Sequence, residues 1–241
     1  ELGIVKKSEN DGSLYAFFRN RVTIPIRKRA RKLIGFTARD ITGNEKAKYI
    51  NSTTSKIFAK GEALFGIDMA ANAARNEDFV ICVEGAPDVL RLQSVGLENA
   101  VATLGTAWTD KHFDALEKIT KSICFIPDCD VPGDGQEFGA GITAVIRNGE
   151  AAIRRGFAVT VLELPFGEVD GKPAKNDADS YITCKDDFTS LEEKHFVVWL
   201  AEKRFPLVKT QVARRKLVTD LTSLLACIDD KLIIADCIEQ L

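Results

Sequence analysis

Two aspartates spaced by two residues stand at the end of an apolar run in this sequence. The run SICFIP (122–127) leads directly into Asp128 and Asp130, with Cys129 between them. Side chains two residues apart in an extended segment share a face, so both carboxylates can contact one ion while Cys129 points away from it. Like charges held together repel, and a divalent cation between them relieves that repulsion. Such a pair alone is more often a solvated turn, so the metal-site interpretation needs further acids.

Two more acidic groups follow apolar runs in the same way. Glu84 directly follows FVICV (79–83), with Asp88 four residues further on, and Asp177 and Asp179 come after AVTVLEL (158–164). Oxygen ligands without a nearby His or Cys favour Mg²⁺ or Mn²⁺ over zinc. Three acidic groups, each beyond a strand of one sheet, predict a divalent metal site.

The elements that must position these acids alternate along the chain. Apolar strands are expected over 79–83, 100–104, 122–127 and 158–164, and helices over 86–96, 109–119 and 136–156. Uniformly apolar strands alternating with helices indicate a mainly parallel sheet covered on both faces. Ligands of such sheets gather at the carboxyl ends of the strands, which is where the acids stand.

Three regions are expected along the chain. Residues 1–61 hold short β-like runs, among them VTIPI, where Pro25 predicts an edge or irregular strand. Residues 62–186 form the parallel-sheet domain. Residues 187–241 are predicted to be helical throughout, beginning with a capping-box pattern at Thr189 or Ser190. The fold class is therefore α/β: an α+β N-terminal basic subdomain, a parallel-sheet subdomain and C-terminal helices.

Charge is distributed unevenly. Residues 1–60 carry 14 Lys/Arg and 5 Asp/Glu, a balance of +9, whereas the rest of the chain has a balance of −11. This asymmetry favours a polyanion, nucleic acid above all, as the partner of the first quarter, over a merely solvated basic face. The run IRKRARK (26–32) by itself fits a solvated turn better than a site.

Composition bounds the remaining classes. Hydrophobic content of 45% and charged content of 28% are ordinary for a soluble globular protein. No run of 18 uncharged apolar residues occurs, so no membrane span and no membrane partner are expected. Six cysteines without a C-x-x-C pair indicate a cytoplasmic protein without a structural zinc site. The N-terminus, ELGIVKKSEN, reads as that of an excised fragment.

Several motifs together resemble a known family. VEGAPD (83–88), followed by DCD (128–130), resembles the TOPRIM domain of primases, topoisomerases and some nucleases. FFRNRVTIPI, LIGFTAR, AKYINS and KIFAKGEALFG resemble, in order, the catalytic core of bacterial DnaG-type primases, which LGT (104–106) and DADSYI also fit. The Ala-Pro pair in EGAPD and the 49 residues from Asp128 to Asp177 depart from the family pattern. They point to an insertion around 133–157 or 165–175 and to a divergent member, such as one from a phage or mobile element.

The resemblance implies an activity and a set of site residues. A DNA primase makes short RNA primers on single-stranded DNA from NTPs by metal-dependent nucleotidyl transfer, and a replicative helicase is its possible partner. The catalytic residues would be Glu84, Asp128 and Asp130. They would also bind Mg²⁺ or Mn²⁺, with Asp88, Asp177 and Asp179 as further or outer ligands, and Glu84 could instead be the general base. Nucleotide or DNA contacts would come from Arg19, Arg21, Arg39, Lys48, Asn51 and Lys60.

Three other functions fit parts of the sequence. A TOPRIM nuclease would use the same acids to hydrolyse DNA, but it does not need the N-terminal motifs. A haloacid-dehalogenase-type phosphatase would use DCD as its nucleophile motif and leave Glu84 unexplained. A non-catalytic DNA-binding module of a larger replication protein would not need all the acids. These considerations favour the primase interpretation.

Overall fold

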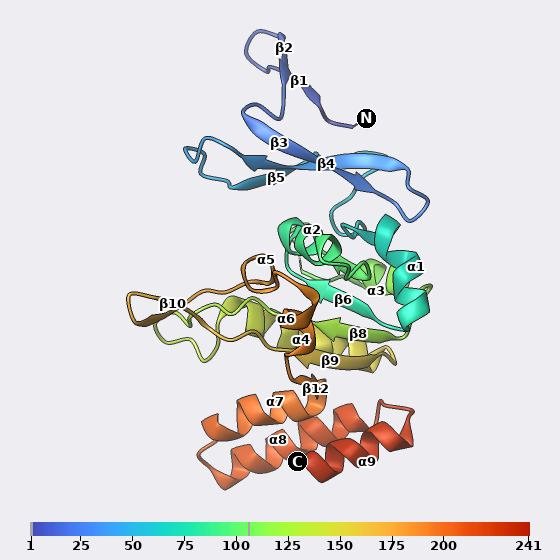
Figure 1. Cartoon of the computed structure of the whole chain (residues 1–241), viewed down its shortest axis with the longest axis vertical. Helices are drawn as coiled ribbons and strands as arrows, with labels where there is room; N and C mark the ends of the chain where they lie inside the picture. Colours follow the sequence, from blue (N-terminus) through green and yellow to red (C-terminus); the bar gives the residue numbers. More distant parts are fainter. Residues whose placement is uncertain (1, 106) are drawn as a thin grey trace.

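The structure, a computed structural model, describes residues 2–105 and 107–241. Its N-terminal part consists of β-strands rather than the predicted α+β arrangement, because the helices of the described residues begin at Ile67 (Figure 1). A hairpin of β1 (Val5–Lys7) and β2 (Leu14–Ala16) precedes an antiparallel sheet of β3 (Arg21–Arg27), β4 (Leu33–Asp40) and β5 (Tyr49–Asn51), in the order β3-β4-β5. Pro25 lies on the edge strand β3, as predicted, because a proline in the middle of a sheet would interrupt the hydrogen-bond ladder.

A five-stranded sheet forms the centre of the molecule, in the order β12-β9-β8-β6-β7. The strands β6 (Val80–Val83), β7 (Ala100–Ala102), β8 (Ser122–Phe125) and β9 (Ala158–Leu162) are parallel to one another. They alternate with α1 (Ile67–Glu77), α2 (Ala86–Ser94), α3 (Asp110–Leu116) and α4 (Ala140–Arg154). The predicted parallel α/β domain is therefore confirmed.

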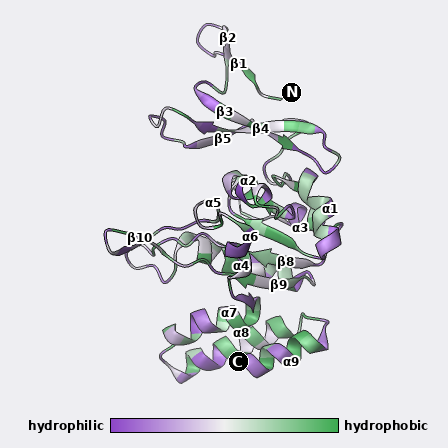
Figure 2. Cartoon of the chain, in the orientation of Figure 1, coloured by the Kyte–Doolittle hydropathy of each residue, from purple (hydrophilic) through white to green (hydrophobic). Residues whose placement is uncertain are grey.

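Hydrophobic cores cover both faces of this sheet, and its central strands are hydrophobic along their length (Figure 2). Along β6, Val80 and Cys82 face one core with α1, α3, α4 and α7, while Ile81 and Val83 face the other with α2. This alternation follows from the two-residue period of a strand. The second core also contains Ile26 of β3, so the N-terminal sheet packs directly on the central domain.

The remaining elements follow β9. The hairpin of β10 (Gly167–Val169) and β11 (Lys172–Ala174) projects from the side of the domain (Figure 1). It is followed by α5 (Ala178–Tyr181), α6 (Lys185–Thr189), β12 (Glu193–His195), α7 (Phe196–Arg204), a 3₁₀ turn (Phe205–Leu207), α8 (Gln211–Leu225) and α9 (Lys231–Gln240). None of the helices in the described ranges is long and apolar enough to cross a membrane.

The prediction of a wholly helical region from 187 onward is wrong at residues 193–195. There Glu193, Lys194 and His195 form β12, which pairs antiparallel with β9. The pairing satisfies backbone groups of β9 that an uncovered sheet edge would leave without partners. The following helix accordingly begins at Phe196, with His195 as its N-cap. The predicted start at Thr189 or Ser190 is wrong, because these two residues end α6.

The helix α4 begins at Ala140, four residues later than its sequence pattern predicted. Close contacts fix its start and the middle of its second half. A Cβ at Gly139 would lie 2.2 Å from the Asp130 carbonyl oxygen, and a Cβ at Gly149 would lie 2.2 Å from the ring of Phe196 on α7. The domain boundaries at 61/62 and 186/187 stay predictions.

Candidate active site

The carboxyl ends of β6 and β8 bring three acids together. Glu84, Asp128 and Asp130 each place a carboxylate oxygen within 4.8 Å of those of the other two. Within the described residues, these three side chains form the one cluster of potential metal ligands whose ligand atoms are close enough together to bind a single ion. Sheet topology explains the contact between residues 44 positions apart in the sequence, because β6 and β8 are hydrogen-bonded neighbours.

Backbone pairing after β8 orients the two aspartates. Cys129 is 3% exposed and lies in the core, so it points away from the acids as expected. Its amide donates to the carbonyl of Asn176 at 2.8 Å, and the amide of Asn176 donates back at 3.2 Å. This isolated bridge brings Lys175 and Asp177 alongside the aspartates.

Helix α4 begins directly against the acids. The amide of Gly141 donates to Asp130 Oδ2 at 3.2 Å, so the positive end of the helix faces a carboxylate. A Cβ at Gly141 would lie 2.3 Å from the Asp128 carbonyl oxygen and 2.7 Å from Glu84 Oε1. Only glycine allows this approach, and the sequence interpretation did not identify the residue.

Lys175 is a second residue that the sequence interpretation missed. Its ammonium group contacts Asp128 and lies 3.0 Å from Asp130 Oδ1, so it neutralises part of the acidic charge. Partial burial opposes the charged lysine, but the two carboxylates outweigh it and raise the pKa of Lys175 above its usual value. The only sequence signal was a lysine next to the acidic segment 176–179, since its partners stand 45 or more positions earlier.

Glu84, Asp88 and Asp128 have pKa values above the ordinary values of carboxyl groups. Burial, with the charges of Asp128 and Asp130, raises the pKa of Glu84 to about 7. Burial, with the charge of Asp128, raises the pKa of Asp88 to about 6. Burial also raises the pKa of Asp128, despite the opposing effect of Lys175. Concentrated negative charge of this kind is what a divalent cation would stabilise.

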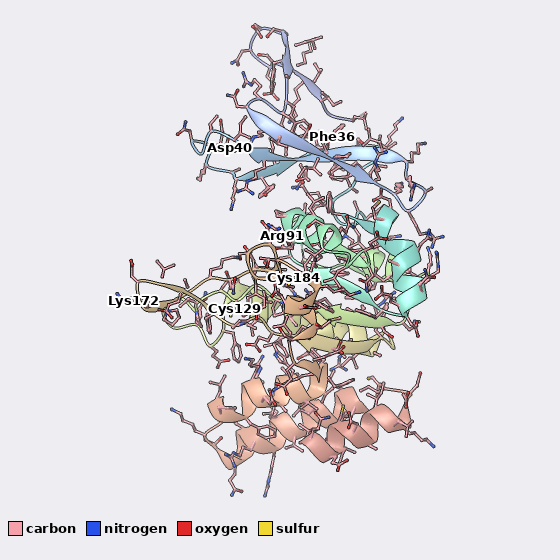
Figure 3. All side chains as sticks on the ribbon, in the orientation of Figure 1. Phe36, Asp40, Arg91, Cys129, Lys172 and Cys184 are labelled. Carbon is pink, nitrogen blue, oxygen red and sulfur yellow. The ribbon has the colours of Figure 1, made fainter. Side chains whose placement is uncertain are left out.

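The outer acids each have protein partners. Asp88 accepts hydrogen bonds from the amides of Gly85 at 2.9 Å and Asp179 at 3.1 Å, which ties the start of α2 to α5. Asp177 caps α5 by accepting from the amide of Ser180 at 2.9 Å. Asp179 pairs with Arg91 Nε at 3.2 Å, and Figure 3 labels that arginine on α2. All three acids line the same cleft as Glu84, and their predicted role as metal ligands stays a prediction.

The cleft, of about 500 Å³, has a basic wall opposite the acids. Arg39, Lys48 and Lys60 line it from the N-terminal region, together with Tyr49 and Asn51. Asn51 Nδ2 donates to the Leu104 carbonyl at 3.1 Å, while its Oδ1 is buried without a hydrogen-bond partner in the described structure. The last residue of the predicted LGT motif, Thr106, lies outside the described residues.

The other two predicted contacts, Arg19 and Arg21, are not among the residues that line this cleft. The Arg21 guanidinium donates to the carbonyls of Ala47 at 2.9 Å and Lys48 at 3.3 Å, so it holds the loop that carries Lys48. Arg19 is exposed and stacks on the ring of Tyr15, 5.3 Å from the ring centroid. Their predicted role in nucleic-acid binding stays a prediction.

Known proteins share this architecture. Residues 1–71 match the family of the DNA primase catalytic core, N-terminal domain, and residues 81–182 match the Toprim-like family. The DNA primase of Staphylococcus aureus is 31% identical over 218 residues, which is 90% of this chain and 33% of that protein. A DNA primase domain from Pseudomonas aeruginosa superposes with a TM-score of 0.77 at 29% identity, over 98% of this chain and 71% of that one. The E. coli primase catalytic core gives a TM-score of 0.75 at 28% identity, over 98% and 72%.

The fold and the acidic site thus define a TOPRIM domain joined to a basic β subdomain. This chain belongs to the DnaG-type primase catalytic cores. It spans about a third of the length of the curated primases that it matches. Neither the nuclease nor the binding-module alternative is favoured by these matches.

The close approach of α4 predicts that Gly141→Ala weakens metal binding. The added methyl group would meet backbone atoms of Asp128 that cannot yield, so the acids must separate. We expect Mg²⁺ to bind at least about tenfold more weakly in calorimetric titrations, the usual effect of disturbing groups that orient metal ligands. Gly149→Ala is the matched control on the same helix: its clash with Phe196 should destabilise the fold and leave Mg²⁺ affinity unchanged. Wild-type affinity in Gly141→Ala would contradict this account.

The position of Lys175 predicts that Lys175→Met tightens Mg²⁺ binding. The ammonium group competes with a metal ion for Asp128 and Asp130, and removing it leaves their charge uncompensated. We expect roughly tenfold tighter binding, since a unit charge at this range is worth about 1–4 kcal/mol between water-like and surface-like dielectrics. We also expect a lower melting temperature without metal. Lys172→Met, on the projecting hairpin (Figure 3), is the control, and an unchanged affinity in Lys175→Met would count against the competition.

The raised pKa of Glu84 predicts a pH-dependent response to metal. Because its folded value of about 7 exceeds the ordinary 4.5, its contribution to stability without metal is present below about 4.5 and lost as pH rises through about 7. Mg²⁺ binds the ionised carboxylate, so the increase in melting temperature on adding Mg²⁺ should be larger at pH 8 than at pH 5.5.

Glu84→Gln isolates this effect from other titrating groups. Burial lowers the pKa of His112 and His195, which makes stability change in the opposite direction over this range. The wild-type melting temperature minus that of Glu84→Gln, measured without metal, should fall as pH rises from 5.5 to 8. A difference that does not change with pH would show that Glu84 titrates normally.

Proposed function

We propose that this chain is the catalytic core of a DNA primase that joins ribonucleotides into a primer on single-stranded DNA. The observation that carries the proposal is the cleft itself, where Glu84 and Asp128 face Arg39, Lys48 and Lys60. Acids alone would suit many metal-dependent enzymes. Acids opposed by cations suit a substrate that carries both a metal ion and several phosphates.

The donor set fits Mg²⁺ or Mn²⁺. The three clustered groups are all carboxylates, and Lys175 already occupies a cationic position between two of them. Glu84, Asp128 and Asp130 would hold the ion. When bound, it would stabilise negative charge on the phosphate oxygens and favour ionisation of the attacking 3′-hydroxyl. Asp88, Asp177 and Asp179 would stiffen this edge of the cleft and serve as outer ligands.

The basic wall would bind phosphates. Arg39, Lys48 and Lys60 would hold the triphosphate of an incoming NTP or the template backbone, contacts that give affinity without sequence reading. Asn51 Oδ1, buried without a partner, would accept a hydrogen bond from a nucleotide hydroxyl or amino group. A DnaG primase catalytic domain solved bound to ssDNA, with a TM-score of 0.77 at 27% identity over 99% of this chain, supports single-stranded DNA as the template. Arg19 would act at the edge of that path, and Arg21, whose side chain is 4% exposed, would support it by holding the loop that carries Lys48.

The proposal also includes a protein partner and a compartment. A replicative helicase would be the partner that brings such a core to its template. The cytoplasm would be the compartment, which is supported by the six free cysteines of the chain.

Primer synthesis tests the proposal. The chain, single-stranded DNA, labelled NTPs and Mg²⁺ or Mn²⁺ should give short oligoribonucleotides, and Asp128→Asn/Asp130→Asn should reduce their yield by at least about 10²-fold, a typical effect of removing charge-stabilising groups. Asp229→Asn, an exposed acid beyond α8, is the control and should retain full activity. Metal-dependent cleavage of DNA without synthesis would replace the proposal with the nuclease alternative.

A further inference from the structure

A second hollow, of about 560 Å³, lies at the same interface as the catalytic cleft but shares none of its lining residues. The segment that links β5 to α1 separates the two. Lys60 of this segment lines the catalytic cleft, whereas its residues 55–59 line the second hollow. Figure 1 shows the β3–β4 turn descending toward α1 at this end of the sheet, away from α5.

The rim of this second hollow is strongly basic. Five cations line it, and Glu62 is the one carboxylate among its lining residues; the cations are Arg27, Lys28, Arg29, Lys56 and Lys118. None of the five forms a salt bridge within the part of the chain that the structure describes, since its ion pairs involve other residues. Unpaired like charges around one concavity repel each other, and an anion with several charges would relieve that repulsion.

The floor of the hollow is apolar. Its accessible surface comes from the half-buried Ile57, Ala59 and Ala115, because Ile34, Phe58 and Leu64, which also line it, are at most 3% exposed. A ligand that covers this floor would remove apolar surface from water, which stabilises the complex. The hollow therefore combines a place for a flat, weakly polar group with a rim for phosphates, in a volume typical of small-molecule sites.

The walls favour a compact ligand over a nucleic-acid strand. Three separate segments enclose the hollow: the β3–β4 turn, residues 55–59 and the end of α3. Arg29 Nη1 approaches the Lys118 carbonyl at 3.5 Å and so brings the turn against the α3 end. A ligand short enough to lie between these three segments would contact all of them at once, and we call the hollow that they line the cup.

We propose that this cup is a second, non-catalytic site for a nucleoside polyphosphate, with the base on the apolar floor and the phosphates on the basic rim. Glu62 is the one carboxylate among the residues that line the cup, and one carboxylate is too few to hold a catalytic metal ion. Nucleotide binding at the cup therefore does not require a divalent metal ion. The inference goes beyond primer synthesis and does not depend on it. It also gives a role to the basic run 26–32, which the sequence alone indicated to be a solvated turn.

Fluorescence anisotropy of methylanthraniloyl-ATP on the full chain in EDTA tests the proposal. We expect saturable binding, weakened at least about tenfold in Lys56→Glu/Lys118→Glu because two charge-assisted contacts become repulsive. Both lysines are exposed, so these substitutions leave the core intact. The matched control, Lys111→Glu/Lys209→Glu, changes net charge equally at two other exposed lysines and should bind as the wild type does.

Two further measurements distinguish the cup from the catalytic cleft and from a strand-binding surface. Without a divalent ion, a triphosphate in the catalytic cleft would face the uncompensated carboxylates of Glu84 and Asp128, so in EDTA the probe should bind at the cup alone and Lys48→Glu/Lys60→Glu should not weaken it. Loss of binding in this variant would place the nucleotide in the cleft and overturn the proposal. An oligothymidylate of twelve nucleotides should compete poorly with methylanthraniloyl-ATP. If it displaced the probe at lower concentrations than unlabelled ATP does, the cup would be a strand-binding surface. Equal weakening in the control variant, or no binding in EDTA, would also overturn it. Primer synthesis is measured separately and depends on the catalytic acids, so its failure would not affect the proposal for the cup.

Discussion

Repulsion among three carboxylates held within 4.8 Å of one another is the constraint on which the rest of this structure depends. Parallel pairing of β6 and β8 forces Glu84 toward Asp128 and Asp130. The protein lowers the resulting cost with the Lys175 ammonium group and with the amide of Gly141 at the positive end of α4. The remaining cost is visible in Glu84, whose pKa rises to about 7. These features describe a site arranged for a multivalent cation.

Polar ties between the two subdomains keep the basic wall at a fixed distance from the acids. His112, fully buried, bonds through Nε2 to the Lys60 carbonyl at 3.1 Å, and Thr109 Oγ1 donates to the Gly61 carbonyl at 2.6 Å. Both ties hold the segment that presents Lys60 to the cleft. Asn51 makes the corresponding tie to Leu104 from β5. Electrostatic recognition of a metal-bound triphosphate needs such fixed opposition of charges, because reorganisation during the reaction would reduce its benefit.

Much of this arrangement could be predicted from the sequence, because its determinants are local. Apolar runs that end in Glu84 or Asp128 specify both a buried strand and the edge where an acid must lie. The β12 strand could not be predicted in this way, since the sequence EKHFVVWL fits a helix and only the uncovered edge of β9 draws three of its residues into the sheet. Lys175 and Gly141 were missed for a related reason. Their roles come from contacts with residues 11 to 57 positions away, and no local pattern marks them. Arg21 could be recognised in a family-like motif, but its structural contacts could not be predicted: it holds the loop that carries Lys48.

Anomalous diffraction from crystals of the chain soaked in Mn²⁺ would test the central claim most directly, because it locates the ion without relying on activity. The account predicts a peak bound by the carboxylates of Glu84, Asp128 and Asp130, with the Lys175 ammonium group moved away from the two aspartates. No peak at these residues at saturating Mn²⁺, or a Lys175 that keeps both of its ion pairs, would contradict it.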